Sequence, residues 1–272
     1  MLDVLFFGGI GLYLIGMVAH FFGQVWKKEK VTRIAWNIFL GGFVLQTLYL
    51  VVRGIQAGRV PMSNQFEFAV MFSWGIAVIL LFLHYRLKLD WITTIAMIMT
   101  WAVYLYAALL PREIHELMPA LRSVWFVSHI GSAAFAYAAF MLAGASGVRY
   151  LMIQKKNPDD ERLPEIDFFI YRLIAIGLLL LTVTIVIGAI WAEEAWSSFW
   201  TWDPKEVWAL ITWILYAIYL HLRLGRKKTG TAMAWYAILA VPVVLFTFSL
   251  EMCVALALIA ARSSSLSYTL PP

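Results

Sequence analysis

Long apolar runs separated by short polar connections recur along the whole chain. Eight runs are each long enough to cross about 30 Å of hydrocarbon as a helix that rises roughly 1.5 Å per residue. We therefore predict an all-α integral membrane protein with about eight transmembrane helices, in a single polytopic domain over residues 1–272. The predicted helices lie near residues 2–24, 34–52, 65–84, 91–110, 123–152, 168–190, 206–224 and 232–260.

The composition excludes a soluble globular domain. Hydrophobic residues make up 62% of the chain and charged residues 14%, with a mean hydropathy of +0.80, whereas soluble domains are about 45–50% apolar and about 25% charged. The run from Leu2 to Phe22 lacks the basic start and cleavage site of a signal peptide, so we interpret it as a retained helix. Cys253 is the only cysteine, which excludes an internal disulfide and dithiol chemistry by the chain alone.

The basic residues of the connections predict the orientation. One alternate set of connections carries 15 of the 21 Lys and Arg residues, and the other set carries 6. Positively charged loops are retained on the inner side of a membrane. We therefore expect both termini on the outer, periplasmic side. The net charge of +5 is spread over short loops, which argues for a topological signal and against nucleic acid as a partner.

The segment from Trp191 to His221 contains six tryptophans. Anchoring at a membrane interface needs only about one or two at each helix end. We predict that residues 191–206 form an external tryptophan-rich loop that binds a large, flat, apolar ligand; an aromatic belt at the membrane surface is the alternative. The residues that crowd together before the next apolar run are Trp196, Trp200, Trp202 and Asp203. Asp203 also precedes Pro204 as a helix N-cap precedes a first helical proline.

The predicted spans give the five histidines different depths. His221 follows the outer end of its span by 15 residues, which places it roughly 22 Å deeper. His20 and His84 reach a similar depth, about 27–28 Å from the outer ends of their spans. His129 lies near the outer end of the fifth span, and His115 lies in the outer loop before it. His129 and His221 differ in depth by more than ~10 Å, so they cannot bind one metal ion through bonds of about 2 Å.

Each histidine also has a simpler interpretation. His20, His84 and His221 lie near span ends, where a histidine often faces lipid headgroups. His129 is followed by small residues, which suit ordinary helix packing as well as a flat ligand. An ionisable side chain inside a transmembrane bundle is nevertheless a candidate functional residue.

Three segments resemble one known family. The pattern WxxxWxWDPKExW over residues 196–208 is similar to the tryptophan-rich "WWD" signature of the CcsA/ResC-type cytochrome c biogenesis proteins. The segment from Pro119 to His129 is similar to the family segment that carries the first external haem-ligating histidine. The segment from Gly58 to Glu67 is similar to the family's short external loop after the second span.

The resemblance implies a haem-handling protein. The expected function is haem transport and attachment of haem to apocytochrome c, as the membrane core of a system II cytochrome c synthase, with haem lyase-type thioether formation. A haem exporter or chaperone of the CcmC type and a haem-bearing electron-transfer subunit stay open as alternatives. The implied iron ligands are His129 and His221, and Lys205 or Arg122 is expected to pair with a haem propionate. The expected haem contacts are His129, His221, Trp196, Trp200, Trp202, Asp203 and Trp208.

The resemblance also implies a cofactor, partners and a location. The cofactor is non-covalent haem b, which is transferred to the client. The partners are a CcsB/ResB-type membrane protein, an apocytochrome c with a CxxCH motif and thiol-reducing proteins. The location is the bacterial inner (cytoplasmic) membrane or the thylakoid membrane. No residue has the pattern of a nucleophile or an acid–base pair, so we expect catalysis mainly by proximity and orientation.

The C-terminal tail departs from the family pattern. The family carries a second external histidine there, whereas residues 263–268 read SSSLSY. His115 is the candidate replacement, and a solvated loop histidine is its simpler interpretation. At the inner site, the family supplies the ligand opposite His221 from the partner subunit. His20 and His84 are then spectators, although depth permits either as a ligand within the chain.

Overall fold

Eight α-helices follow one another along the part of the chain that the computed structural model describes, residues 1–87, 92–114, 116 and 119–267. A π-helical turn, Leu83–Leu87, extends the third helix, and a 3-10 turn, Pro119–Leu121, precedes the fifth. The helices are α1 Leu2–Val25, α2 Glu29–Ala57, α3 Gln65–Phe82, α4 Thr93–Ala107, α5 Val124–Lys156, α6 Leu163–Trp196, α7 Pro204–Leu224 and α8 Thr231–Ser267.

The prediction of an all-α multi-pass membrane protein is confirmed. Within the described residues, seven helices are long and apolar enough to cross a membrane, and α4 is a shorter apolar helix of 15 residues. The sequence predicted a longer fourth span, over 91–110. The helix ends early because Ala108, Leu109 and Leu110 bond to carbonyls three residues back, and Pro111 disfavours helical geometry in the residue before it.

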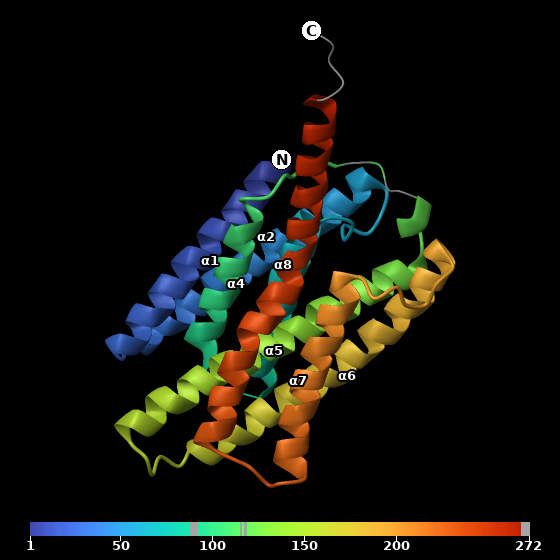
Figure 1. Cartoon of the computed structure of the whole chain (residues 1–272). Coiled ribbons are helices and arrows are strands. Elements are labelled where there is room, and N and C mark those ends of the chain that lie inside the picture. Colours follow the sequence, from blue (N-terminus) through green and yellow to red (C-terminus); the bar gives the residue numbers. More distant parts are fainter. Residues whose placement is uncertain (88–91, 115, 117–118, 268–272) are drawn as a thin grey trace.

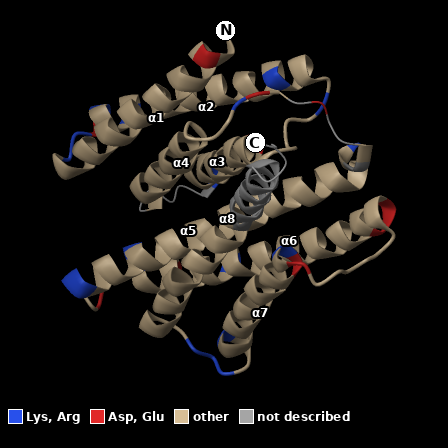
Figure 2. Cartoon of the chain, turned by 45° about the horizontal axis from the view of Figure 1, so that its top comes forward, with Lys and Arg blue, Asp and Glu red and all other residues tan. Residues whose placement is uncertain are grey.

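The helices form one bundle in which α5 is central (Figure 1). Helix α1 packs along α2, α3 packs on α4 and α5, and α7 packs on α6 and α8. Helix α5 contacts α6 and α8 most extensively, because its middle is rich in alanine and glycine. A Cβ atom on Gly147, for example, would lie 2.7 Å from the carbonyl oxygen of Ala234 in α8. Charged residues gather at the helix ends and connections (Figure 2), as expected for helices that face lipid.

A buried charge cluster joins α2 to the start of α3. The Glu67 carboxylate is fully buried and accepts hydrogen bonds from Arg53 Nε at 2.9 Å and Arg59 Nη1 at 2.8 Å. It also accepts from the backbone N–H of Ser63 at 2.8 Å. The Asn64 side chain caps α3 by accepting from the Glu67 N–H. This cluster holds the short loop after α2 against the bundle.

Candidate functional site

The connection between α6 and α7 is short and sharply turned. Helix α6 continues to Trp196, so the segment 191–206 that was predicted as a loop includes the end of α6 and the start of α7, and residues 197–203 are the connection itself. Ser197 and Trp202 have φ angles of 56° and 59°, in the left-handed region that bulky residues rarely adopt. Such a backbone costs on the order of 1–3 kcal/mol per residue and persists only where the surroundings hold it.

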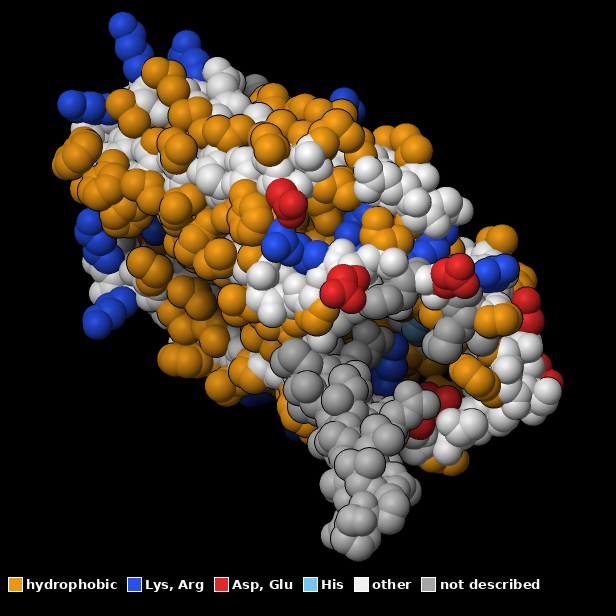
Figure 3. Space-filling model, turned by 90° about the horizontal axis from the view of Figure 1, so that it is seen from above, with side chains coloured by type: hydrophobic (Ala, Val, Ile, Leu, Met, Phe, Trp, Pro, Cys, Tyr) orange, Lys and Arg blue, Asp and Glu red, His pale blue; other side chains and the backbone are white. Residues whose placement is uncertain are grey.

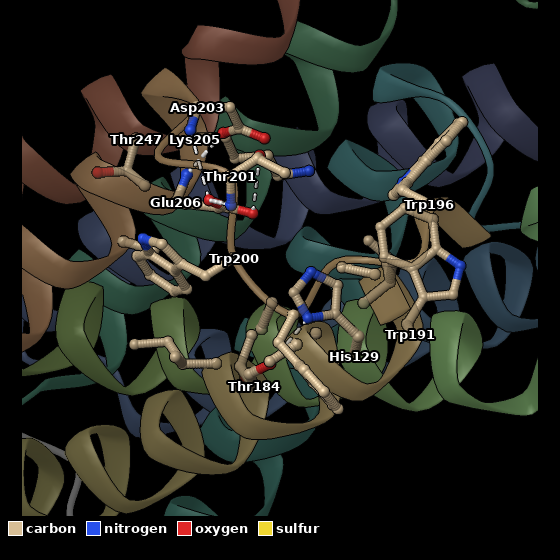
Figure 4. A pocket seen from close by; sticks show the side chains of 18 of the residues that line it. His129, Thr184, Trp191, Trp196, Trp200, Thr201, Asp203, Lys205, Glu206 and Thr247 are labelled. Carbon is tan, nitrogen blue, oxygen red and sulfur yellow. Dashed lines mark hydrogen bonds between the residues drawn. The ribbon is translucent and has the colours of Figure 1, made fainter. Parts of the chain in front are cut away.

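Glu206 holds this connection from the first turn of α7. Its carboxylate accepts from the N–H of Thr201 at 2.8 Å and from the N–H of Asp203 at 3.3 Å, on either side of Trp202 (Figure 4). The Asp203 side chain accepts from the Glu206 N–H at 2.9 Å, which completes a capping box, and Pro204 opens the helix. The predicted role of Asp203 as the N-cap of α7 is therefore confirmed.

A large pocket lies beneath this connection. Its empty volume is about 1010 Å³, including open solvent at its mouth, and ligand pockets commonly range from about 300 to 1,000 Å³. The molecular surface is hollowed at this end of the bundle (Figure 3). The walls come from α3, α5, α6, α7, α8 and the 197–203 connection. They are mainly apolar and aromatic, and their polar members include His129, Thr184, Thr201, Asp203, Lys205, Glu206 and Thr247.

His129 enters the pocket from α5 and lies against α6 (Figure 4). Its Nδ1 is 2.8 Å from the carbonyl oxygen of Thr184. A carbonyl can only accept, so Nδ1 carries a proton, and in the neutral imidazole the lone pair belongs to Nε2. The ring is also stacked near Trp191, with 6.2 Å between centroids.

The predicted tryptophans separate into two groups. Trp196 and Trp200 line the pocket, together with Asp203. Trp202 is 69% exposed and packs edge-on against Trp200, while Trp208 packs against Phe246 in α8, and neither belongs to the pocket lining. The indole Nε1 of Trp200 is buried and has no hydrogen-bond partner among the described residues. A buried donor of this kind suits a ligand that brings an acceptor.

Lys205 is the pocket's cationic wall residue, whereas Arg122, the other predicted propionate partner, is exposed and lies outside the described lining. One predicted ligand and the C-terminal tail fall on residues whose side chains are not described. His115 lies outside the described residues, and the side chains of residues 250–272, including the SSSLSY tail, are not described.

His20 and His84 both contact Trp36 of α2, whereas His221 lies on α7. His221 is exposed on α7, about 18 Å along the helix from the pocket residue Ala209. His20 is fully buried, with Nδ1 3.0 Å from Thr94 Oγ1, so it does not face lipid headgroups. His84 stacks on Trp36 of α2 at 3.7 Å between centroids. No group of three or more His, Cys, Asp or Glu side chains in the described part of the chain could hold a metal ion.

The sequence interpretation missed the α6 side of the pocket. Thr184, Gly188 and Trp191 contact or border the His129 ring. Their spacing of four and three residues places them on one helix face. That spacing was the available signal, but α6 is apolar on all sides, so nothing marked this face as the one toward the pocket.

Comparison with known proteins identifies the family. Residues 62–256 match the family described as "Cytochrome C assembly protein". The chain belongs to this family. The chain is 30% identical to the cytochrome c biogenesis protein CcsA of Guillardia theta over 260 residues, which cover 85% of this chain and 86% of that protein. It is 31% identical to CcsA of Pyropia yezoensis, covering 88% and 89%, and 34% identical to CcsA of Prochlorococcus marinus strain SARG, covering 75% and 76%.

The fold has a solved counterpart. The structure titled cytochrome c heme lyase CcmF superposes with a TM-score of 0.66 at 15% sequence identity. The match covers 96% of this chain but 51% of the other, so this chain spans about half the length of that protein. At this identity the likeness concerns the fold alone. The family and its CcsA members give this multi-pass membrane protein a role in cytochrome c maturation.

Proposed function

We propose that the pocket beneath the 197–203 connection receives haem b and presents it to apocytochrome c, with this chain as the membrane core of a system II cytochrome c synthase. The observation that carries the proposal is the His129 imidazole, whose Nδ1 lies 2.8 Å from the carbonyl oxygen of Thr184, inside a large aromatic pocket. The family's role in cytochrome c maturation supports the same conclusion.

The donor set fits haem better than a bare metal ion. A bare ion such as zinc is held by about three or four protein ligands, and the described part of the pocket offers one imidazole and no such group. Haem supplies the equatorial nitrogens itself and needs only axial ligands from the protein. An imidazole protonated at Nδ1 and bonded to a backbone carbonyl is the usual form of a ligating histidine.

Other pocket residues have complementary roles. Trp196 and Trp200 offer aromatic faces for the flat macrocycle. Lys205 supplies a positive charge for a propionate, and the buried Trp200 N–H supplies a further donor. Bound haem would supply the vinyl groups that join the client's CxxCH thiols as thioethers. The chain's own contribution is then to bind, orient and shield the reactants, because proximity and orientation alone lower a barrier substantially.

We propose a second, inner haem site that is shared with a CcsB/ResB-type partner. Helix α7 presents an exposed apolar stripe that ends in His221. The stripe residues Ile211, Ile214 and Ile218 are 38%, 45% and 46% exposed, and their spacing continues to His221 on one face. A ligand from the partner, facing that stripe, would complete the site. Thiol-reducing proteins would keep the client's thiols reduced.

We further propose that the 197–203 connection and both termini lie on the outer side of a bacterial inner or thylakoid membrane. The distribution of basic residues supports this orientation. The start of α1 and the last turns of α8 lie at the end of the bundle that carries this connection (Figure 1). All three should therefore lie on the same side of the membrane.

The decisive experiment compares three histidine variants co-expressed with the partner and a cytochrome c reporter. We expect His129→Ala to lose the outer haem and to abolish covalent haem attachment, measured by absorption spectra and haem staining. His221→Ala should lose the inner haem, and His84→Ala, in a histidine that stacks on Trp36, should retain both. Full haem content and full maturation in His129→Ala would overturn the proposal. Normal haem binding without any attachment by the unmutated complex would favour the CcmC-type exporter or chaperone.

A further inference from the structure

The outer half of α6 forms a fitted surface for the His129 ring. Thr184, Gly188 and Trp191 lie on one face of the helix, and all three face the same imidazole. Figure 4 shows His129 between the labelled Thr184 and Trp191. We refer to these three residues as the α6 seat.

Thr184 fixes the protonation pattern of the ring. Its carbonyl oxygen accepts from His129 Nδ1 at 2.8 Å, so Nε2 keeps the lone pair. The residue is only 4% exposed, and its Oγ1 lies 2.8 Å from both Leu180 O and Ser132 Oγ. The Ser132 hydroxyl in turn donates to the carbonyl of His129 at 3.0 Å. These bonds brace the two helices on either side of the imidazole.

Gly188 provides the space for the ring. A Cβ atom at this position would lie 2.6 Å from His129 Nδ1 and 2.7 Å from its Cε1. Cβ atoms essentially never approach another atom this closely, so a side chain at residue 188 requires the imidazole or the helix backbone to shift. The atom nearest to the added Cβ is His129 Nδ1, which is also the atom that bonds the Thr184 carbonyl. Moving the ring would therefore break that hydrogen bond.

We propose that the α6 seat positions His129 for iron ligation, with Gly188 as its indispensable member. The seat selects the Nδ1-protonated tautomer and the ring plane, so that Nε2 ligates the iron of a metalloporphyrin. This inference rests on the proposed function, because it assumes that His129 is an iron ligand. Gly188 acts through His129 and is therefore a positioning residue.

The chain contains a matched control on the same helix. Gly177 also faces a ring of α5, since a Cβ atom there would lie 2.6 Å from Cε1 of Phe140. Gly177 and Gly188 thus impose the same steric demand on an α5 ring, but only one of the rings is an imidazole. Any general cost of adding a methyl group between α5 and α6 should appear at both positions.

The first experiment compares Gly188→Ala, Gly177→Ala and His129→Ala as purified complexes with the partner. We expect Gly188→Ala to weaken haem binding at the outer site by ~10-fold or more, as for other residues that orient a metal ligand. Its reduced absorption spectrum should shift toward that of His129→Ala, and any outer haem that it retains should have a reduction potential different from that of the unmutated protein. Gly177→Ala should keep the spectrum and potential of the unmutated protein. An unmutated spectrum and potential in Gly188→Ala would overturn the proposal.

A thermal-unfolding cycle of the haem-free protein tests the seat without any ligand. Gly188→Ala should lower the unfolding midpoint in the unmutated background. In the His129→Ala background it should be neutral or stabilising, because the ring is gone and alanine is the better helix former. Equal destabilisation in both backgrounds would show that the methyl group meets something other than the imidazole, and would also overturn the proposal.

The two experiments separate this inference from the proposed function. If His129→Ala loses the outer haem while Gly188→Ala keeps it, the α6 seat fails and the haem site stands. If the unfolding cycle shows coupling but neither variant changes haem content or spectrum, the seat exists and the assignment of His129 as an iron ligand fails.

Discussion

Helices α3 and α7 begin with the same capping pattern, but the two helix starts have different roles. Each has a polar N-cap, Asn64 or Asp203, and each has a glutamate three residues later whose N–H is bonded by that cap. Glu67 of α3 turns inward to two arginines and is fully buried. Glu206 of α7 turns back to the strained connection beneath which the pocket lies. A common local motif therefore stabilises a closed corner in one region and an open site in the other.

The neighbours decide the difference. Arg53 reaches Glu67 from α2 and also bonds the backbone carbonyls of Arg112 and Glu113, so the closed corner joins three parts of the chain. Around Glu206, the groups that donate to the carboxylate are the two amides on either side of Trp202 and the hydroxyl of Thr201. The first glutamate holds helices together, and the second shapes the few residues that cover the pocket. Mutations at the two positions should therefore affect different measurements.

The largest effect on stability is expected for Glu67→Gln. The change leaves Arg53, which is only 2% exposed, without its buried counter-charge, and removing one partner of a buried ion pair typically costs about 3–5 kcal/mol. Thermal unfolding in detergent should show a large fall in the midpoint and a lower yield of folded protein. Any protein that does fold should retain the spectrum of the outer haem. A midpoint equal to that of the unmutated protein would contradict the buried-pair interpretation.

Glu206→Gln should affect ligand binding more than stability. The amide retains one acceptor oxygen in place of a carboxylate, and hydrogen bonds to charged groups contribute about 1.5–3 kcal/mol. Since the lost bonds lie on either side of the left-handed Trp202, we expect the connection to relax and the outer haem content to fall, with a modest change in unfolding midpoint.

Asp203→Asn is the matched control for Glu206→Gln. Asparagine and aspartate are equally good N-caps, so stability and haem content should both stay near those of the unmutated protein. A loss of haem in Asp203→Asn without a loss of stability would show that the pocket needs the charge of Asp203 and not only its cap. That outcome would break the parallel between the two helix starts.

The smallest effect is expected at Asp160, a partly buried carboxylate in the connection between α5 and α6 that touches neither region. Hydrogen bonds from Arg162 lower the pKa of Asp160 from 3.8 to about 2. A lowered folded-state pKa stabilises the protein above the unfolded value and loses that stabilisation as the pH falls toward about 2. Asp160→Asn should therefore change the unfolding midpoint slightly at neutral pH, and this change should shrink as the pH falls through about 2. A larger difference in acid than at neutral pH would contradict this.

The sequence was sufficient for the helices and for the start of α7. Eight apolar runs predicted the eight helices, and Asp203-Pro204 predicted the cap that the structure contains. Predictions that depended on how a helix is rotated were incomplete. Trp208 on α7 was predicted to contact the ligand, but it does not line the pocket, whereas Trp200 in the connection does. The sequence of α7 does not indicate which side of the helix faces the pocket. Membrane helices are apolar toward lipid and toward one another, so periodicity does not reveal their inner face.

Interactions between distant segments were the other gap. Arg53 pairs with Glu67, and His129 contacts Gly188, and each contact joins two different helices. No local sequence pattern indicates such contacts. The left-handed backbone of Trp202 was equally hidden, because tryptophan has no preference for that conformation. These features arise from tertiary packing, which overrides what each residue favours alone.

The pocket has walls from five helices, α3, α5, α6, α7 and α8. A ligand bound there contacts several helices at once, so separating any of them would expose the ligand. Binding therefore also stabilises the packing of the bundle. By thermodynamic linkage, a ligand present at 1,000 times its Kd adds about 4 kcal/mol to the stability of the state that binds it. Proteases in the membrane act on the fraction of protein that has opened. The loaded protein should then outlast the empty one in the cell. With haem as the proposed ligand, the supply of haem would help to set the amount of this protein.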